Sequence, residues 1–506
     1  MKPTIIHFFK THWDALPAAA LAFVWIAFYT AHGGIGISPD SVAYLSTANH
    51  FSETAQFTDY NNLPLVNFPL GYPLFLGLIK LIFFTGVIEA APIINSLILA
   101  SVLYTCSYLL YQIKIKNGFY RLLILCLILS SPGIVEVYTM LWSETLFVLL
   151  GLFFVVAFLH YLENEQLKWL IIASAIATLA CFVRYIGITW LITGGVLIMF
   201  NMQINWRKKF KHLGWMALVG CSLPLLNILR NHWRSTTLAG VRQASLNSFN
   251  TNLHDFIQVL GYWFPTGEND SAFTIIAIGF VLLMMVCLLL GYRLLQQQYF
   301  NSAITILCVF VLVYSGAMLI IASFSRFETL SSRLLIPLYI PLVLLIAHFF
   351  YRWIQASHSY QKWLFYGAFS VWCLIIGHHH YQAHQFNWEG IGYAGIPGYT
   401  DDHWKQSPLL QFMKAHHNSY QAPIYSNAND AVFFLANIKA SPLPHKDLTE
   451  EIAPFLKHQS IYLVWFEYGK NPDLIDDVYI KQHFKEAKEW QFKDGSIFYF
   501  TYTKPE

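Results

Sequence analysis

Charged residues are scarce in this sequence, and their scarcity excludes an ordinary soluble protein. Asp, Glu, Lys and Arg make up 12% of the 506 residues, whereas soluble domains carry about 25%. Hydrophobic residues make up 56% and aromatic residues 17%. This composition predicts an α-helical polytopic membrane protein. The net charge of +3 says little, because the distribution of charge matters more in such a protein.

Common catalytic and ligand-binding motifs are also missing. The sequence has no C-x-x-C or H-E-x-x-H spacing, no glycine-rich dinucleotide motif, no P-loop and no G-x-S-x-G turn. It has no basic stripe of the kind that binds nucleic acid, and no evident internal repeat, which counts against transporter folds built from repeats. All seven cysteines lie in apolar segments, so we expect small buried hydrophobic residues rather than disulfides or metal ligands.

The first apolar run covers about residues 16–31 and follows Lys2 and Lys10. No small-residue cleavage site separates this run from a soluble domain, so we expect no cleavable signal. The run is predicted to be the first membrane helix, with its basic start in the cytoplasm.

Eleven further apolar segments follow, each near the ~20 residues that a membrane-spanning helix needs. They cover residues 71–90, 91–112, 119–139, 145–162, 168–184, 186–200, 213–229, 272–292, 302–324, 334–351 and 361–378. The first of these is broken by Pro69, Gly71 and Pro73, so we expect it to be partly re-entrant or interfacial. The sequence thus predicts about 11–12 membrane segments.

The basic residues predict a topology. They cluster in five connecting segments, at Lys114, Lys116 and Arg121, at Lys168, at Arg207, Lys208, Lys209 and Lys211, at Arg293, and at Arg352 with Lys362. The positive-inside rule places all of them in the cytoplasm. This is consistent with eleven net crossings if segments 71–90 and 91–112 together make one. Residues 379–506 would then lie outside the cytoplasm.

The remaining charges gather on the predicted outer face. Asp40 lies there at the end of the first helix, and Glu144 starts the fifth segment. Six arginines share this face, which the positive-inside rule disfavours for them: Arg184, Arg230, Arg234, Arg242, Arg326 and Arg333. Arginine binds phosphate through two parallel hydrogen bonds, so the set suggests a site for an anionic lipid headgroup. Snorkelling, or pairing with Glu144 or Glu328, would also explain each arginine.

The stretch 38–73 contains the carboxylate of Asp40 at a membrane boundary, where it is costly unless it is used or paired. Such a carboxylate could take a proton from an acceptor hydroxyl, while the arginines stabilise a departing phosphate. Aromatic residues nearby, including Tyr44 and Tyr72, suit either sugar stacking or an interfacial belt. A solvated connecting loop is the simpler interpretation of this stretch.

A histidine run, His378-His379-His380 with His384, suggests either a metal site or a polar boundary after a helix. Short histidine tracts are only compositional hints, so we expect the boundary.

The C-terminal residues contain no span long enough to cross a bilayer. The segments APIYSN, AVFFLA, SIYLVWFE and SIFYFTYT are predicted to be strands, and SPLLQFMKAHH and PHKDLTEEIAPFLKH to be helices. The sequence therefore predicts a membrane domain at 1–378 and a small α/β domain at 379–506. Within the latter, Tyr425, Ser426, Asn427 and Asp430 could contact a substrate, although ordinary turn chemistry explains such residues as well.

Six segments of the membrane part, in this order, form a recognisable series. They are SPDSVAYLSTA, NFPLGYPLFLGLIKL, SSPGIVEVYTMLWSETLF, LACFVRYIG, LPLLNILRNHW with LAGVRQAS, and SSRLLIPLYIPL. The series resembles the GT-C superfamily of polyprenyl-phosphate-sugar-dependent glycosyltransferases, in its protein O-mannosyltransferase-like and aminoarabinose transferase-like group. The resemblance covers about residues 12–378, and the order of the segments carries it.

The resemblance implies an undecaprenyl- or dolichyl-phosphate-linked sugar as donor. It also implies transfer on the extracytoplasmic face with inversion, with the Asp after the first helix as base or metal ligand. Many members carry two adjacent acids at this site, whereas this chain has Pro39-Asp40-Ser41. Because a divalent metal usually needs several oxygen ligands, we expect metal-free catalysis, with a divalent metal as the alternative.

The predicted protein is thus a multi-pass glycosyltransferase of the cell envelope, and its compact loops fit a bacterial inner membrane. Its site comprises Asp40 as base, Arg242, Arg326 and Arg333 as phosphate ligands, and Glu144, Arg184, Tyr44 and Tyr72 as supporting residues. Its partners would be a lipid-linked sugar, a glycan, lipid or protein acceptor, and the bilayer.

Two other classes of protein remain as alternatives. A lipid or solute transporter would use the same charges as a pathway, but it should place ionisable groups near the bilayer midplane. Here they lie at predicted helix ends, with Lys80 as the main exception. A non-catalytic scaffold would leave the arginines unexplained.

Overall fold

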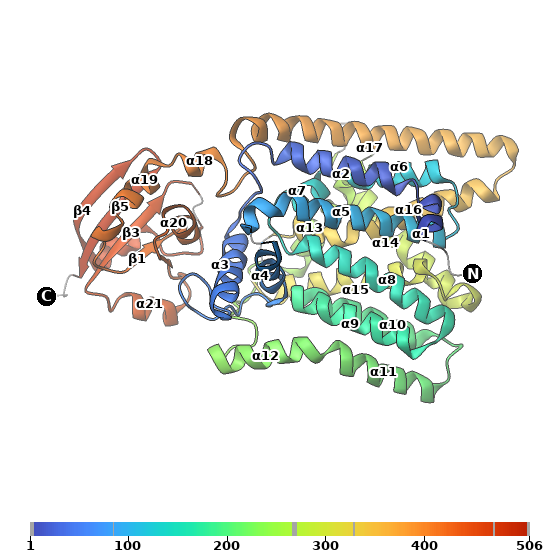
Figure 1. Ribbon diagram of the computed structural model, residues 1–506, viewed down its shortest axis with the longest axis horizontal. Coiled ribbons are helices and arrows are strands. Elements are labelled where there is room, and N and C mark those ends of the chain that lie inside the picture. Colours follow the sequence, from blue (N-terminus) through green and yellow to red (C-terminus); the bar gives the residue numbers. More distant parts are fainter. Residues whose placement is uncertain (1–4, 84, 266–270, 327–328, 469–470, 503–506) are drawn as a thin grey trace. The chain divides into compact units, whose positions relative to one another are not determined.

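The chain divides into two compact units in a computed structural model that describes residues 5–83, 85–265, 271–326, 329–468 and 471–502 (Figure 1). The first unit comprises Met1–Ala31, Leu65–Phe75 and Ile88–Gly390, and the second comprises His32–Pro64, Leu76–Val87 and Ile391–Glu506. The predicted domain boundary after residue 378 falls inside a continuous helix, α17 (Ser359–Ala394).

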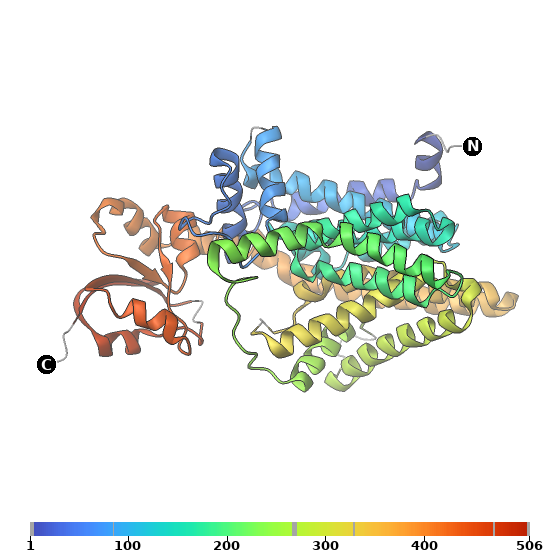
Figure 2. The ribbon, with the colours of Figure 1, turned by 90° about the horizontal axis from the view of Figure 1, so that it is seen from below.

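The first unit is helical. Besides α17, its helices are α1 (Ile5–Thr11), α2 (Ala15–Tyr29), α5 (Val87–Gln112), α6 (Gly118–Leu129), α7 (Pro132–Thr139), α8 (Glu144–Asn164), α9 (Leu167–Val183), α10 (Ile188–Phe200), α11 (Trp206–Gly220), α12 (Ser222–Ser235), α13 (Phe249–Tyr262), α14 (Ala272–Leu295), α15 (Ala303–Phe324) and α16 (Ser332–Ala356), with short 3-10 turns η1 (Tyr185–Gly187) and η2 (Gln297–Tyr299). A loop leads from α12 to α13 (Figure 2). Helix α4 (Gly71–Phe83) is divided between the two units.

Every predicted apolar segment contains a helix, because long apolar runs leave the backbone no other way to satisfy its hydrogen bonds in lipid. Among the described residues, five helices are long and apolar enough to cross a membrane, or up to seven if each bent pair counts as one span. Four shorter apolar helices accompany them, at Ala15–Tyr29, Gly71–Phe83, Leu167–Val183 and Tyr185–Phe200. The α-helical polytopic fold predicted from composition is therefore confirmed.

Two of the apolar segments are broken in the middle. Helices α6 and α7 meet at a bend of 62°, and α11 and α12 at a bend of 45°. At the first break Pro132 starts α7, since a proline lacks the N–H that would continue the preceding helix. The break leaves the carbonyl of Ser130 available to a side chain, and His384 Nε2 bonds it at 2.7 Å.

The histidine run therefore lies inside a helix, and the predicted boundary after a helix is wrong. His380 Nδ1 bonds the Ser130 hydroxyl at 2.9 Å, and His384 Nδ1 bonds the Tyr29 hydroxyl at 2.6 Å. These contacts attach α17 to α2 and to the break between α6 and α7.

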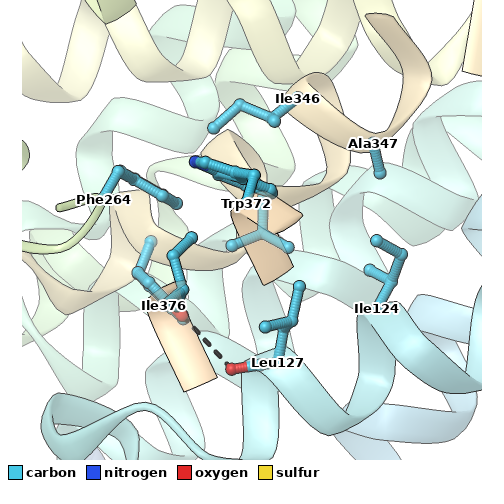
Figure 3. Close-up of a pocket in the computed structure, with 9 residues that line it drawn as sticks. Ile124, Leu127, Phe264, Ile346, Ala347, Trp372 and Ile376 are labelled. Carbon is cyan, nitrogen blue, oxygen red and sulfur yellow. Dashed lines mark hydrogen bonds between the residues drawn. The ribbon is translucent and has the colours of Figure 1, made fainter. Parts of the chain in front are cut away.

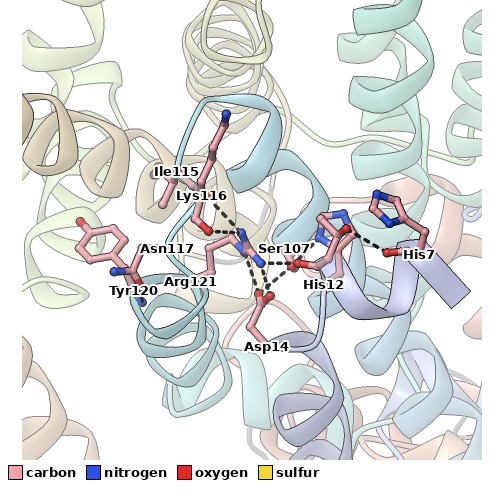
Figure 4. A network of polar contacts seen from close by, with 10 residues as sticks. His7, His12, Asp14, Ser107, Ile115, Lys116, Asn117, Tyr120 and Arg121 are labelled. Atoms are coloured by element: carbon pink, nitrogen blue, oxygen red, sulfur yellow. Dashed lines mark hydrogen bonds and ion pairs between the residues drawn. The ribbon is translucent and has the colours of Figure 1, made fainter. Parts of the chain in front are cut away.

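A buried ion pair attaches the residue before α2, Asp14, to Arg121 on α6 (Figure 4). Asp14 and Arg121 are 0% and 1% exposed, and Arg121 donates to both carboxylate oxygens of Asp14. Arg121 also donates to the carbonyls of Thr11, Ile115 and Lys116. Arg121 was predicted to lie in a basic connecting loop, and this is wrong, because it lies on α6 and pairs there with the buried carboxylate of Asp14.

A small apolar pocket lies among α6, α16 and α17 (Figure 3). Its lining is aliphatic and aromatic: Ile124, Leu127, Phe264, Tyr339, Val343, Ile346, Ala347, Trp372 and Ile376. The Tyr339 hydroxyl donates to the Leu127 carbonyl at 3.3 Å. The lining carries no carboxylate, imidazole or amine, and its one phenol, Tyr339, is engaged in this hydrogen bond.

The cysteines are all free. Cys106, Cys181, Cys308 and Cys373 are buried, as predicted, whereas Cys287 on α14 is exposed. The expectation of uniform burial is thus wrong for Cys287, because α14 buries little of its surface within the protein.

The second unit combines α3 (Pro39–Thr54) with a C-terminal α/β domain. The domain contains α18 (Asp402–Lys405), α19 (Pro408–Ala415), η3 (His417–Ser419), β1 (Ile424–Ser426), α20 (Asn429–Ala436), β2 (Ser441–Pro442), α21 (Thr449–Phe455), β3 (Ser460–Phe466), α22 (Asp477–His483), β4 (Phe484–Phe492) and β5 (Gly495–Tyr502). The strand order is β2-β1-β3-β5-β4. Strand β1 pairs in parallel with β2 and β3, and β5 pairs antiparallel with β3 and β4.

Alternating side chains of the sheet supply two cores. Val464, Phe466 and Ile497 pack with residues of α19 and α20, whereas Ile461, Leu463, Phe498 and Phe500 pack with residues of α21 and α22. The predicted α/β domain is confirmed, but AVFFLA is wrong as a strand. It lies in α20, where Val432 and Ala436 fall on one face, four residues apart, and are buried.

Candidate active site

Asp40 lies in the first turn of α3 and is half-buried. Ser38 caps this helix, because its hydroxyl accepts from the Ser41 N–H at 3.4 Å while the Ser41 hydroxyl accepts from the Ser38 N–H at 3.1 Å. Pro39 follows as the first helical residue. The prediction that Asp40 ends the first membrane helix is wrong, since α2 ends at Tyr29 and Asp40 begins a separate helix. A helix N-terminus favours a carboxylate.

The backbone just before Asp40 is attached to the start of the C-terminal domain. The Tyr399 N–H donates to the Ile37 carbonyl at 2.8 Å, and the Thr400 hydroxyl donates to the Ile35 carbonyl at 2.9 Å. Gly398 has a φ of +142°, and a Cβ there would lie 2.5 Å from the Ile37 carbonyl oxygen. The segments 35–37 and 398–400 therefore lie side by side.

A second carboxylate of this unit, Asp430, is held by neutral groups. The Tyr60 hydroxyl donates to Asp430 Oδ1 at 2.7 Å, and the Asn429 amide bonds the same hydroxyl. Tyr60 is 4% exposed, and its ring stacks on Phe433 with centroids 4.4 Å apart. Burial raises the pKa of Asp430 to about 6; the Tyr60 hydrogen bond opposes this rise, while the charges of Asp40 and Asp59 add to it.

The other polar residues that were singled out in the C-terminal domain have structural partners. The Ser426 hydroxyl accepts from the Ala428 N–H at 3.0 Å. Asn427 donates to the Phe466 carbonyl at 2.8 Å and accepts from the Phe466 N–H at 2.9 Å. These bonds are the turn chemistry that was weighed against substrate contact.

Tyr44 and Lys80 also belong to the second unit. Tyr44 lies on α3 and is 3% exposed. Lys80, the exception to the predicted placement of charges at helix ends, donates to Asn49 and to Glu53, each at 2.9 Å. The hydrogen bond from Lys80 lowers the pKa of Glu53, so Lys80 has a local partner.

In the first unit, Glu144 brings together two of the predicted arginines. Glu144 is the first residue of α8 and is 1% exposed. Its Oε1 lies 2.7 Å from Arg184, which caps the end of α9, and 3.0 Å from Arg333 Nε in the first turn of α16. The guanidinium of Arg333 also lies 4.0 Å from the centre of the Trp142 ring. Glu136 on α7 is close enough for its charge to interact with Arg333 and Glu144.

Arg242 and Arg326 lie on two neighbouring segments of the same unit. The Arg326 N–H donates to the Gln243 carbonyl at 2.8 Å, and its guanidinium donates to Gln243 Oε1 at 2.6 Å. Arg242 is exposed and donates to the Asn67 carbonyl at 3.3 Å. Arg230, predicted to lie in a loop, lies on α12 and donates to the Leu65 carbonyl at 2.5 Å. Glu328, the alternative partner of an arginine, lies outside the described residues.

Tyr185 connects these two arginine groups and was not among the residues predicted from the sequence. Its hydroxyl donates to the Val66 carbonyl at 3.1 Å and accepts from Asn231 at 3.0 Å and Asn227 at 3.3 Å. Tyr185 directly follows Arg184, and the charges of Arg230 and Arg242 act on it. A signal was present in the sequence: Asn227 and Asn231 fall four residues apart on one face of an apolar helix.

The proline- and glycine-broken start of α4 has a steric cause. A Cβ at Gly71 would lie 2.4 Å from the Phe182 carbonyl oxygen, so only glycine lets α4 approach the end of α9 this closely. Tyr72, predicted as a supporting residue, follows it and is 1% exposed. The described residues contain no group of three or more His, Cys, Asp or Glu side chains that could hold a metal ion.

No protein-family model and no curated protein matches this sequence. Solved structures do match it. ArnT from Cupriavidus metallidurans, in its apo state and bound to undecaprenyl phosphate, aligns at 12% identity and a TM-score of 0.55, covering 97% of this chain and 98% of that chain. The archaeal oligosaccharyltransferase AglB from Archaeoglobus fulgidus, in complex with an inhibitory peptide and a dolichol-phosphate, aligns at 10% identity and a TM-score of 0.51, covering 90% and 70%. The chain therefore has the GT-C fold of membrane glycosyltransferases, as its sequence resemblance implies.

Proposed function

We propose that this protein is an integral-membrane glycosyltransferase that moves a sugar from a polyprenyl-phosphate donor to an acceptor on the extracytoplasmic face. The observation that carries the proposal is the GT-C fold over nearly the full length of ArnT, one of whose structures holds undecaprenyl phosphate. The AglB structure with a dolichol-phosphate adds a second relative in fold with a polyprenyl ligand. The acceptor would be a glycan, lipid or protein, and the membrane a bacterial inner membrane.

The arginines would bind the donor phosphate. Arg242 is exposed and uses one nitrogen on a backbone carbonyl, while Arg326 is positioned by Gln243 on the neighbouring segment. Arg333 is oriented by Glu144 and the Trp142 ring. Side chains fixed in this way bind an anion at a smaller cost in side-chain entropy than freely moving ones. Guanidinium groups also keep their charge at all physiological pH values.

Asp40 would act as the general base. The acceptor oxygen attacks the anomeric carbon, the bond from that carbon to the phosphate oxygen breaks, and the configuration inverts. The acceptor proton passes to the Asp40 carboxylate, while the lipid phosphate leaves with both bonding electrons. The arginines stabilise the charge that develops on this phosphate. This route needs no metal ion.

A direct test is to incubate the purified protein with a panel of polyprenyl-phosphate sugars and a mixed envelope acceptor fraction, and to follow the release of lipid phosphate. We expect release from at least one donor. Absence of release from every donor, with folded protein and intact donor binding, would favour the transporter alternative. Flux assays in vesicles then decide between the two.

The side of the membrane is tested separately. The basic segments predict that residues 379–506 lie outside the cytoplasm and that the segment near residue 210 lies inside. Reporter fusions at residue 380 and near residue 210 should therefore report opposite sides. Two fusions on the same side would contradict the predicted eleven net crossings.

A further inference from the structure

We propose that Thr400, in the segment 398–400, is a positioning residue for the carboxylate of Asp40. By binding the backbone at residues 35–37, the segment fixes the point and direction from which α3 starts, and with them the place of Asp40. The inference rests on the proposed function, because Asp40 is a base only if that function holds. It deepens the function by giving the C-terminal domain a role in the reaction.

Two hydrogen bonds join this segment to the backbone before α3. The Tyr399 N–H donates to the Ile37 carbonyl at 2.8 Å, and the Thr400 hydroxyl donates to the Ile35 carbonyl at 2.9 Å. Ile35, Ile37 and Thr400 are all buried. A buried carbonyl that loses its donor bears the full cost of its desolvation, because water does not replace the donor. The two hydrogen bonds therefore determine the register of the two segments.

Two glycines let the segments approach this closely. Gly398 has a φ of +142°, and a Cβ there would lie 2.5 Å from the Ile37 carbonyl oxygen. Gly33 has a φ of +82°, and a Cβ there would lie 2.9 Å from the Thr400 carbonyl oxygen. Only a residue without a Cβ fits either position. The contact is therefore steric as well as polar: the backbones cannot come closer together, and the hydrogen bonds keep them from separating.

The backbone between this contact and Asp40 is constrained at each step. Asp40 lies three residues beyond Ile37. Ser38 caps α3, and Pro39 follows as the first helical residue, where its ring fixes φ. The Val42 N–H donates to the Ser38 carbonyl at 3.1 Å. A displacement of the Ile37 backbone would therefore displace the Asp40 carboxylate as well.

The other end of α3 is attached to the same domain. Tyr60, in the segment that follows α3, donates to Asp430 Oδ1 at 2.7 Å. Its ring stacks on Phe433 of α20 with centroids 4.4 Å apart, and α20 itself packs against α3. A helix that is held at both ends cannot turn to compensate for a shift at one of them. The C-terminal domain therefore determines both the position and the direction of α3.

The first experiment measures amide hydrogen exchange in the purified full-length protein without substrate. Thr400→Val replaces the hydroxyl with a methyl group of similar size and leaves the Ile35 carbonyl without this donor. We expect faster exchange in the first turn of α3, because local opening there becomes less costly. Thr400→Ser keeps a hydroxyl and should restore the slow exchange. Thr54→Val is the matched control, since the Thr54 hydroxyl bonds the His50 carbonyl at the far end of α3, and exchange in the first turn should not change.

The second experiment measures kcat and KM of the same variants with the donor found active in the panel. A misplacement of about 1 Å can cost about a hundredfold in rate, so we expect Thr400→Val to lower kcat by about ten- to a hundredfold. The KM for the donor should not change, because the proposed phosphate ligands are arginines of the other unit. Thr400→Ser should recover most of the rate, and Thr54→Val should match the wild type. A loss of folded protein alone would not produce this split between kcat and KM.

The outcomes separate the inference from the proposed function. Unchanged exchange in Thr400→Val overturns the inference. Faster exchange with a wild-type kcat also overturns it, while an inactive Asp40→Asn in the same assay leaves the proposed function standing. If the wild type releases no lipid phosphate from any donor, the proposed function fails, and the catalytic role of the segment fails with it.

A second variant decides the matter should Thr400→Val not fold. Lys405 is exposed, and its Nζ donates to the Gly33 carbonyl at 3.1 Å. Lys405→Met removes this donor from the same contact without disturbing the buried residues. We expect a smaller change than in Thr400→Val, in the same direction, in both exchange and kcat. Wild-type exchange and wild-type kcat in Lys405→Met would overturn the inference.

Discussion

Carboxylates of the two units are stabilised in opposite ways: Asp14 and Glu144 are buried, whereas Asp430 is half-buried. Asp14 and Glu144 in the first unit each contact arginine, so they form fixed ion pairs. Asp430 in the second unit is held by a phenol and an amide, and it faces the like charges of Asp40 and Asp59. Asp14 and Glu144 thus each have a cationic partner, whereas burial and like charges raise the pKa of Asp430 to about 6. The first arrangement suits a scaffold and the second suits a reacting site.

The largest expected effect on activity is that of Asp40→Asn. The variant keeps the size and polarity of the side chain but cannot accept the acceptor proton, and a positioned general base contributes about 10²–10⁴-fold to rate. We expect normal insertion, folding and donor binding, with turnover reduced at least about a hundredfold. The turnover of the variant is measured as the rate at which lipid phosphate is released. Full turnover in the variant would exclude the base role, and loss of donor binding would point to a structural role instead.

The largest expected effect on stability is that of Arg121→Leu. It leaves the Asp14 carboxylate buried without its cation, and removing one partner of a buried ion pair costs about 3–5 kcal/mol. Thermal unfolding in detergent should show a clear drop in Tm. The matched control is Lys116→Leu, at an exposed neighbour, for which we expect little change. Equal stability of the two variants would show that the pair is not needed.

A smaller effect is expected from Arg→Lys at positions 242, 326 and 333. An ammonium cannot reproduce the two-pronged contact of a guanidinium, so each variant should lose about tenfold in donor affinity, or about 1.4 kcal/mol. Arg207→Lys, at an exposed residue of α11, is the control and should bind as the wild type does. If all three variants bind the lipid donor with wild-type affinity, these arginines are structural.

The smallest effect is the pH dependence of stability that Asp430 contributes. Its pKa in the folded protein, about 6, lies above the ordinary value of about 3.9 in an unfolded chain. Its contribution to stability is therefore fully present below pH ~3.9 and is lost as the pH rises through about 6. The Tm difference between the wild type and Asp430→Asn should shift in favour of the wild type as the pH falls from 7 to 5. A difference that does not change with pH would contradict this assignment.

Much of the fold could be predicted because lipid leaves long apolar runs little choice but to be helical. Short apolar runs are ambiguous, since AVFFLA fits a strand by composition and a helix by its packing. Strand β4 was missed because Lys485, Glu486, Lys488 and Glu489 give it a charged surface at the edge of the sheet. Edge strands often carry such charges.

The candidate site was predictable in part. The types of residue and their helix ends could be read from the sequence, as for Glu144 at the start of α8 and Arg184 at the end of α9. Their pairing through one carboxylate could not, because Arg333 lies 189 positions from Glu144. Asp430 was noticed but explained as turn chemistry, since its contact with Tyr60 spans 370 positions.

The glycine at position 71 sets how far apart two helices can be. Any side chain there would push against the Phe182 carbonyl, two residues before Arg184. The displaced end of α9 would take the guanidinium with it, away from the 2.7 Å contact with Glu144. Gly71→Ala would thus separate Arg184 from Glu144, although residue 71 is distant from both of them in the sequence. A side chain is therefore excluded at residue 71 because it would move the Arg184 guanidinium away from Glu144. The backbone angles of Gly71 are not the reason.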